Sequence, residues 1–380
     1  MKKKLLIFGS YVLVAAMATM ITLTMVGRSA PSKLDRLETL IEERFIGDAD
    51  TEAMEDAAAA AMVKATGDRW SYYISAKDYD THREQEENAY VGVGITIEQQ
   101  ADDSGFLIVM VTDGSPAKEA GIEVNDLLIG VEDQDVRGMT TGEVGALVKG
   151  QEGTKVSLTV LRKGENMTLS VERRRIEQPV AEGEMLENGI GLVTIYNFDA
   201  RCADETIAAI EKLRSEGARK LILDVRNNPG GFADELVKVL DYLLPEGDLF
   251  RSVSFDGTEN VDTSDETYLD MPMAVLVNGN SYSAAEFFAA ALQEYEAAVV
   301  VGEPTVGKGY YQQTIQLGDG SAVALSTGKY FTPKGNTLAE KGITPTVRVD
   351  VDEETASAIY YGTIQPSDDP QIQAAIKALK

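Results

Sequence analysis

The first feature of the hydrophobic pattern is an uncharged run of 22 residues, from Leu5 to Val26, that follows Lys2, Lys3 and Lys4. Such a run is long enough to cross the hydrocarbon core of a bilayer as a helix, and the lysines favour a cytoplasmic N-terminus. We therefore predict a cytoplasmic stub and transmembrane anchor over residues 1–27, with the rest of the chain on the extracytoplasmic side of the cell membrane. A cleaved signal peptide is the alternative, although its apolar region is usually shorter, about 7–15 residues.

The pattern then changes twice between the predicted anchor and the middle of the chain. Leu34, Leu37 and Ile41 recur at helical spacing, which predicts a helical N-terminal region over residues 28–88. Short apolar runs typical of strands fill residues 89–176, which predicts a β-rich domain there.

Strand-like and helix-like segments alternate in the second half. This alternation over residues 177–353 predicts an α/β core, and residues 354–380 are expected to form a C-terminal helical tail. The fold class that follows is α/β and multidomain.

Composition reduces the number of functions that the chain could have. The formal net charge of −27 disfavours a nucleic-acid surface and predicts a highly soluble exterior. The chain has one cysteine, Cys202, so it cannot form an internal disulfide, and no histidine lies near Cys202 in the sequence to make it a catalytic thiol. The single histidine, His82, lies in a polar, charged stretch where a structural role is the better interpretation.

Candidate chemistry appears where a predicted strand turns into a predicted helix. The apolar run 273–277 is typical of a buried strand and residues 287–293 of a helix, so Ser281 and Ser283 lie on the turn between them. Unpaired N–H groups and the helix dipole at such a turn favour an alkoxide nucleophile and an oxyanion. The alternative is structural, because Ser283 and Glu286 also have the spacing of a capping box.

A serine nucleophile needs a base, and Lys308 is the candidate. A lysine can replace histidine if desolvation lowers its pKa from about 10.4 towards neutrality. Lys308 follows the apolar run 297–301 and lies between two glycines. The segment 302–308 also matches most of a phosphate-binding P-loop, but Gly309 stands where Ser or Thr should hold Mg²⁺, and a strand-like segment follows instead of a helix.

These stretches resemble the catalytic core of the carboxyl-terminal processing proteases, the tail-specific Ser-Lys peptidases of subfamily A in peptidase family S41. The family's Asn-x-x-Ser-Ala-Ser-Ala-Ser-Glu element matches residues 278–286, and its Val-Gly-Glu-x-Thr-x-Gly-Lys-Gly element matches residues 301–309. The resemblance implies that Ser283 is the nucleophile, Lys308 the base and Gln312 the residue that orients the lysine. Tyr282 and Ala285 depart from the family pattern, but neither change removes a catalytic group.

A second element of this family is Asp-Leu-Arg-x-Asn-Pro-Gly-Gly, which residues 224–231 resemble. The resemblance implies an oxyanion hole formed by the backbone of Ala284 and of Gly230 or Gly231. Glycine suits this role because a ligand can approach its backbone closely. The resemblance also implies a ClpP/crotonase-like α/β protease core.

The β-rich region resembles a PDZ domain, on the strength of Ser115-Pro116-Ala117 with Ala120-Gly121-Ile122 and the Asn-Asp-Leu-Leu that follows. A PDZ domain adds an extended peptide to a sheet edge and holds its terminal carboxylate with loop N–H groups. The candidate loop for substrate C-termini is Gly92, Val93, Gly94 and Ile95.

Together these features predict a membrane-anchored serine endopeptidase that cleaves protein or peptide substrates with exposed C-termini. The resemblance implies no cofactor, no metal and no nucleic acid, and it is compatible with a homo-oligomer. The alternative is a catalytically silent, membrane-anchored PDZ module that only binds protein C-termini.

Overall fold

The protein is described by a computed structural model over residues 31–379, in which two units separate, one up to Tyr73 and one from Ile74 onward. The first unit contains helices α2 (Lys33–Arg44) and α3 (Thr51–Lys64), as the helical spacing predicts. Ser32 and Asp35 form a reciprocal capping box that starts α2. Strand β1 (Tyr72–Ile74) spans the boundary, and α4 (Ala76–Glu86) opens the second unit.

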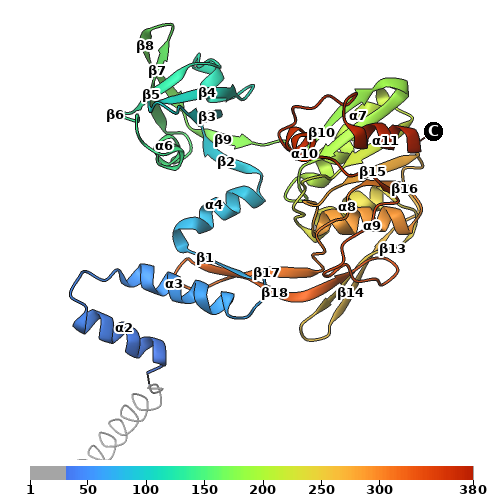
Figure 1. Cartoon of the computed structure of the whole chain (residues 1–380), viewed down its shortest axis with the longest axis horizontal. Coiled ribbons are helices and arrows are strands. Elements are labelled where there is room, and N and C mark those ends of the chain that lie inside the picture. The colour runs from blue at the N-terminus through green and yellow to red at the C-terminus, as the bar shows by residue number, and fades with distance from the viewer. Residues whose placement is uncertain (1–30, 380) are drawn as a thin grey trace, which may run out of the picture. The chain divides into compact units, whose positions relative to one another are not determined.

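A β-rich domain follows α4 (Figure 1). Five of its strands form a sheet in the order β3-β4-β5-β7-β8, with β6 paired to β5, while β2 and β9 form a separate antiparallel ribbon. Alternate residues of these strands are buried around a core that includes Ile108, Leu128 and Leu158. Its elements are β2 (Ala89–Gly92), β3 (Ile95–Gln99), β4 (Phe106–Val111), α5 (Pro116–Glu119), β5 (Leu127–Val131), β6 (Gln134–Asp135), α6 (Thr141–Val148), β7 (Lys155–Arg162), β8 (Glu165–Glu172) and β9 (Arg174–Glu177).

The α/β core is built on a six-stranded sheet in the order β10-β11-β12-β15-β16-β19. All neighbours are parallel except β10 and β11. Its central strands are continuous apolar runs because both faces of the sheet are covered. The elements are β10 (Ala181–Leu186), η1 (Glu187–Gly189), β11 (Ile190–Ile195), α7 (Cys202–Ser215), β12 (Lys220–Asp224), α8 (Ala233–Leu243), β15 (Met273–Val277), α9 (Ala284–Glu294), β16 (Ala298–Gly302) and β19 (Val347–Arg348).

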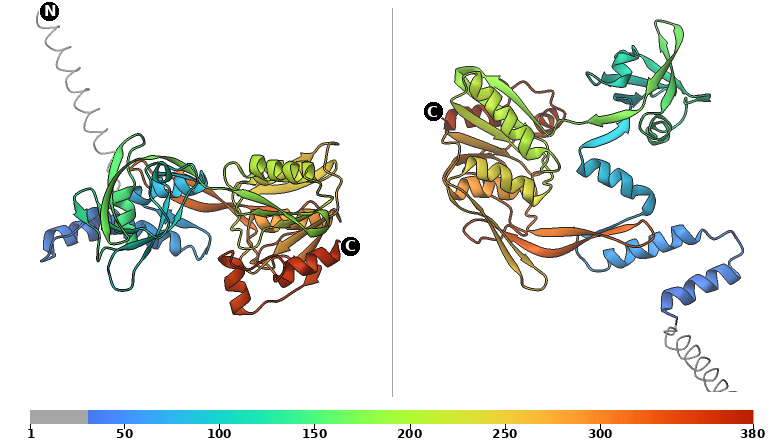
Figure 2. Two further views of the ribbon diagram at one scale, coloured as in Figure 1. Left: turned by 90° about the horizontal axis from the view of Figure 1, so that it is seen from above. Right: turned by 180° about the vertical axis from the view of Figure 1, so that it is seen from behind.

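Two helical layers cover the sheet of the core. Helices α7, α8 and α9 lie on one face and the C-terminal helix α11 (Pro370–Ala378) on the other, as the left view of Figure 2 shows. The first face packs Leu221, Leu223 and Val275 against these helices, and the second packs Ile222 against Ile372 of α11. A shorter helix, α10 (Glu353–Tyr360), precedes α11, and none of its residues is buried.

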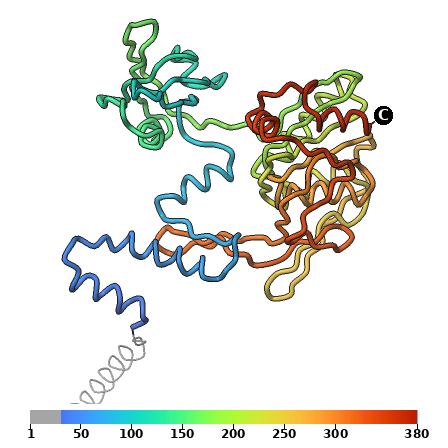
Figure 3. The backbone as a smooth tube through the Cα atoms, viewed as in Figure 1, coloured from blue at the N-terminus to red at the C-terminus, as the bar shows by residue number. Residues whose placement is uncertain are grey.

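A second, antiparallel sheet adjoins the parallel one within the core. Strand β13 pairs with both β14 and β18, and β17 pairs with β18 as a long hairpin that can be followed in orange in Figure 3. The strands are β13 (Gly247–Ser254), β14 (Glu259–Ser264), β17 (Tyr310–Gln316) and β18 (Ala322–Phe331). Since β17 begins two residues after Lys308, this hairpin continues the segment that carries the predicted base.

The predicted membrane span, residues 5–26, lies outside the described residues. Within residues 31–379, none of the helices combines the length and apolar character needed to cross a bilayer.

Candidate active site

The candidate nucleophile lies on a tight turn between a buried strand and a buried helix. All five residues of β15 are buried, and the chain then turns sharply before α9 starts at Ala284. Ser283 occupies the turn with φ +58° and ψ −126°, a conformation that residues other than glycine rarely adopt. Its side chain is 7% exposed. A strained serine at a helix N-terminus is a geometry that active sites use and ordinary caps do not need.

Hydrogen bonds fasten this turn to the end of the neighbouring strand β12. The Ser281 hydroxyl donates to the Val225 carbonyl over 2.7 Å and accepts the Asn278 N–H over 3.0 Å. The Asn278 side-chain oxygen accepts the Asn227 N–H over 2.9 Å, and the Tyr282 N–H donates to the Asn228 carbonyl over 3.1 Å. Because parallel strands end at the same edge of a sheet, the turns after β12 and β15 meet there.

One of the predicted oxyanion residues, Gly230, lies directly against Ser283. Gly230 has φ +92°, and a Cβ at this position would lie 2.7 Å from the Ser283 Cβ and 2.9 Å from the Ala284 nitrogen. The Gly230 N–H already donates to the Asn228 side-chain oxygen over 2.8 Å. By contrast, no hydrogen bond within residues 31–379 engages the N–H of Gly231 or of Ala284. Of the three predicted donors, Ala284 and Gly231 are therefore the two whose N–H groups no other group within residues 31–379 engages.

The candidate base reaches the same place from the turn that follows β16. Lys308 is half-buried, and its Nζ lies 5.7 Å from the ring centroid of Tyr282, the residue before the candidate nucleophile. A lysine at this distance from an aromatic ring is within the range of a cation–π contact. The turns that carry Ser283 and Lys308 thus converge, although the two residues are 25 positions apart in the sequence.

One buried carboxylate joins the two turns. Glu286 is fully buried, and its Oε2 accepts the Ser283 N–H over 3.0 Å and the Lys308 N–H over 2.8 Å. Its Oε1 accepts the Gly307 N–H over 2.7 Å and the Thr305 hydroxyl. Burial raises the pKa of this carboxyl above its usual range, while the four donors oppose that rise.

Sequence reasoning gave Glu286 only the role of a helix cap. The reciprocal contact to the Ser283 backbone does exist, so the capping interpretation is correct for that bond. The same carboxylate also holds the lysine turn, which capping alone does not predict. The available signal was one acidic residue in the otherwise apolar run from Ala284 to Leu292.

Gln312 lies on β17, four residues beyond Lys308. Its side-chain nitrogen donates to the Ser326 hydroxyl over 2.9 Å and to the Tyr310 carbonyl over 3.3 Å. These bonds fix the Gln312 amide between β17 and β18. Its predicted role in orienting Lys308 stays a prediction.

A half-buried acid lies beside the oxyanion turn, and sequence reasoning did not single it out. A Cβ on Gly231 would lie 2.6 Å from the Asp199 nitrogen. Burial, followed by the charge of Glu86, raises the pKa of Asp199 to about 7. Burial and then the charge of Asp199 raise the pKa of Tyr282. No sequence pattern marks Asp199, because its environment comes from segments far apart in the chain.

The single cysteine does not suit the role of a nucleophile, and the single histidine pairs with a neighbouring acid. Cys202 is fully buried, and burial raises the pKa of its thiol to about 12, far from a reactive thiolate. His82 lies on α4 with its Nε2 3.3 Å from a Glu86 carboxylate oxygen.

The candidate loop for substrate C-termini lies at the start of an edge strand. Strand β3 begins at Ile95 and ends the strand order of its sheet, and α6 packs against it. Gly94 has φ +81°, and its carbonyl accepts the Thr112 N–H over 3.0 Å, which fixes the bend. Val93 is buried, so its side chain anchors the loop to the core of the domain. An edge strand beside a helix is the arrangement that adds an extended peptide.

Comparison with known proteins gives matches in both domains. The family model "Peptidase family S41" matches residues 189–349, and the model "PDZ domain" matches residues 107–162. The carboxy-terminal processing protease CtpA of Bacillus subtilis is 33% identical over 367 residues, which cover 92% of this chain and 78% of that protein. A CtpA-like serine protease of Staphylococcus aureus is 32% identical over 84% of this chain, which spans 64% of the length of that relative.

Among solved structures, a Bacteroides fragilis protein assigned to the S41 proteases has the same fold. The TM-score is 0.55 at 18% sequence identity, and the alignment covers 93% of this chain and 98% of the other.

Proposed function

This chain is a serine-type peptidase that belongs to peptidase family S41, and we propose that it cleaves protein substrates near their C-termini with a Ser283–Lys308 dyad. The observation that carries the dyad is the Glu286 carboxylate, which accepts the N–H groups of both Ser283 and Lys308. A buried group that fixes both turns holds a nucleophile and a base in a preorganised arrangement.

The chemistry follows from the position of each group. The Ser283 hydroxyl attacks the scissile carbonyl, and neutral Lys308 takes the hydroxyl proton and then delivers it to the leaving amine. The N–H groups of Ala284 and Gly231 donate to the oxyanion of the tetrahedral intermediate, since the Gly230 N–H is engaged by Asn228. Water then hydrolyses the acyl-enzyme by the same proton transfers. Gln312 orients Lys308 in this scheme.

An unfolded reporter peptide tests the dyad. We expect Ser283→Ala and Lys308→Ala each to lower kcat/KM by about 10³-fold or more, because groups that act as a unit fail together. Lys329→Ala is the matched control, since the Lys329 Nζ also lies over a tyrosine ring, 5.9 Å from the Tyr310 centroid. Equal cleavage by the wild type and both dyad variants would refute the dyad. A wild type that binds the peptide without cleaving it would favour the silent PDZ module.

Substrate capture is proposed for the β-rich domain. The free C-terminus of a substrate would bind at Gly92, Val93, Gly94 and Ile95 while its backbone extends the edge of β3. A peptide with a free C-terminal carboxylate should bind more tightly than the same peptide with a C-terminal amide. Equal affinities would show that the loop does not hold a carboxylate.

Membrane anchoring is proposed for residues 5–26, on the strength of their uncharged run after three lysines. Protease treatment of intact cells should remove the catalytic region, and a protected C-terminus would reverse the orientation. A mature N-terminus near Ser29 would show instead that the segment is a cleaved signal peptide. Light scattering on the purified chain tests whether it forms a homo-oligomer.

A further inference from the structure

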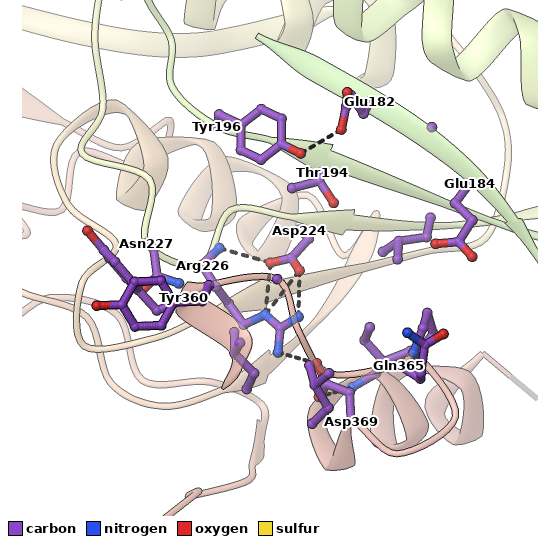
Figure 4. Close-up of a pocket in the computed structure, with 18 of the residues that line it drawn as sticks. Glu182, Glu184, Thr194, Tyr196, Asp224, Arg226, Asn227, Tyr360, Gln365 and Asp369 are labelled. Carbon is purple, nitrogen blue, oxygen red and sulfur yellow. Dashed lines mark hydrogen bonds and ion pairs between the residues drawn. The ribbon is translucent and has the colours of Figure 1, made fainter. Parts of the chain in front are cut away.

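A buried arginine stands at the start of the oxyanion turn. Arg226 is 9% exposed, and it lies two residues after Asp224, where β12 ends. Its Nε and Nη2 donate to the two oxygens of Asp224 over 2.9 Å and 2.6 Å, as a bidentate pair. Its Nη1 donates to Asp369 over 2.7 Å and to Gln371 over 3.0 Å. Figure 4 shows the guanidinium between the two carboxylates.

Asp369 also caps the N-terminus of the C-terminal helix. It is the N-cap of α11, and its Oδ1 accepts the N–H of Gln371 over 2.9 Å and of Ile372 over 3.1 Å. Its Oδ2 is the oxygen that holds Arg226. The Gln371 side-chain nitrogen donates to the Val349 carbonyl over 2.8 Å. The guanidinium is therefore held by a helix that is itself packed against the sheet.

The energetics make this arrangement sensitive to the loss of one partner. Burial lowers the pKa of Arg226, but Asp224 and Asp369 outweigh it and keep the guanidinium charged. Without Asp369 the charge of Arg226 is still paired with Asp224. A buried N–H of the guanidinium loses its acceptor, however, which costs more than the loss of an exposed hydrogen bond. A cavity of about 820 Å³ adjoins Asp224, Arg226 and Asp369. The cavity gives a guanidinium that has lost this hydrogen bond room to shift.

Such a movement would reach the catalytic centre through few residues. Asn227, next to Arg226, donates its N–H to Asn278 on the serine turn. The same turn continues to Gly230, whose Cβ position lies against Ser283, and to Gly231. Misplacing a catalytic group by about 1 Å can cost on the order of 10² in rate.

We propose that Asp369, with Gln371, is a positioning residue of this protease, and that the C-terminal helix fixes the oxyanion turn through Arg226. The inference rests on the proposed function. On this proposal, α11 helps to position the active site and is more than a C-terminal tail.

Asp369→Asn tests the proposal, because asparagine keeps the shape and can still cap α11 with its one side-chain oxygen. Its NH₂ group then stands where Oδ2 accepts the Arg226 N–H, so this hydrogen bond is lost. The matched control is Asp352→Asn at the N-cap of α10, where an exposed carboxylate accepts the Thr355 N–H over 2.8 Å. Steady-state cleavage is normalised to the number of sites that a serine-directed acylating reagent titrates. We expect Asp369→Asn to lower kcat per titrated site about tenfold with KM within about twofold, and the control to match the wild type.

A merely structural role would reduce the number of titrated sites and leave kcat per site unchanged, and that result would overturn the proposal. If Asp369→Asn does not fold, Gln371→Met decides, since it leaves both carboxylates in place and removes only the neutral hydrogen bonds to Arg226 and to the Val349 carbonyl. We expect it to lower kcat per site about two- to threefold, and an unchanged kcat per site would count against the proposal. A wild type without peptidase activity would refute the proposed function itself, whereas an active wild type with a fully active Asp369→Asn variant refutes only the positioning role.

Discussion

At the scale of single residues, the site depends on close approach between backbones. A Cβ on Gly230 would come within 2.7 Å of the Ser283 Cβ, a separation that real Cβ contacts do not reach. The turn after β12 can therefore lie against the nucleophile only because this residue has no side chain. The positive φ of Gly230 adds a second requirement for glycine.

Gly230→Ala should therefore abolish most activity while the chain still folds. The new Cβ would strain the backbone and press against Ser283, so the oxyanion turn would move. We therefore expect kcat/KM to fall by about 10²-fold or more. Gly217→Ala is the matched control, because Gly217 has φ +108° but nothing within 4 Å of its Cβ position. The control should lose about 1–2 kcal/mol of stability to strain and keep its activity per folded chain. Similar activity in both variants would contradict the close approach.

Asp199 should give the stability of the core a dependence on pH. Its pKa is raised to about 7 in the folded chain, against about 3.9 for an unperturbed aspartate. The folded state therefore holds a proton that the unfolded state releases. This contribution is fully present below about pH 4 and is lost as the pH rises through 7.

Asp199→Asn should accordingly reduce the loss of unfolding free energy between pH 5 and pH 8. Urea unfolding of the wild type and the variant at both pH values measures this loss. Asp270→Asn, a change at an exposed aspartate, serves as the control and should behave as the wild type does. An identical loss in Asp199→Asn and wild type would exclude the raised pKa.

At the scale of elements, helix α9 is the central support of the site. Its residues from Ala284 to Leu292 are all buried, and all but Glu286 are apolar, as is typical of a helix inside a protein. The Phe288 ring lies 5.4 Å from the ring of Phe198, in the segment next to Asp199. The helix thus connects the serine turn to the packing beneath the oxyanion turn.

Phe288→Ala should destabilise the catalytic core by about 3–5 kcal/mol, the usual cost of removing a buried aromatic side chain. Phe255→Ala is the comparison, since Phe255 is 82% exposed and its loss should change stability by less than about 0.5 kcal/mol. Chemical denaturation of the full chain, followed through the unfolding of the core, measures both. Equal losses of stability in the two variants would mean that packing of α9 does not stabilise the core, contrary to its burial.

At the scale of the molecule, the β-rich domain and the α/β core bury separate hydrophobic clusters. The segment that forms the β-rich domain begins with β2 and ends with β9. These two strands pair with each other, and Ala89 lies opposite Glu177. Because these ends are neighbours, a short linker can replace residues 89–176 without stretching the chain.

Removing residues 89–176 separates capture of a substrate from its cleavage. We expect the shortened chain to cleave a short peptide at a rate similar to the wild type, and a folded protein with a floppy C-terminal tail about tenfold more slowly. A faster rate on the short peptide would indicate an inhibitory gate. Unchanged rates on both substrates would show that this domain does not recruit substrates.

The sequence by itself determined the features that depend on local patterns. Periodicity predicted the strand 273–277 and a helix after it, which the structure confirms as β15 and α9, with the helix starting earlier, at Ala284. Motif resemblance predicted a serine peptidase of family S41 with a PDZ domain, and the comparisons confirm both. It also named Ser283, Lys308 and Gln312, whose catalytic roles stay predictions.

Only the tertiary structure decided which distant groups meet. Glu286 joins the serine and lysine turns. Asn228 accepts the N–H of Gly230 but not that of Gly231. Arg226 contacts Asp369, which lies 143 positions later in the chain. None of these contacts follows from spacing, because hydrogen bonding and burial depend on segments that come together only when the sheet forms. The raised pKa of Asp199 has the same origin, since desolvation is a property of the folded environment and not of the residue.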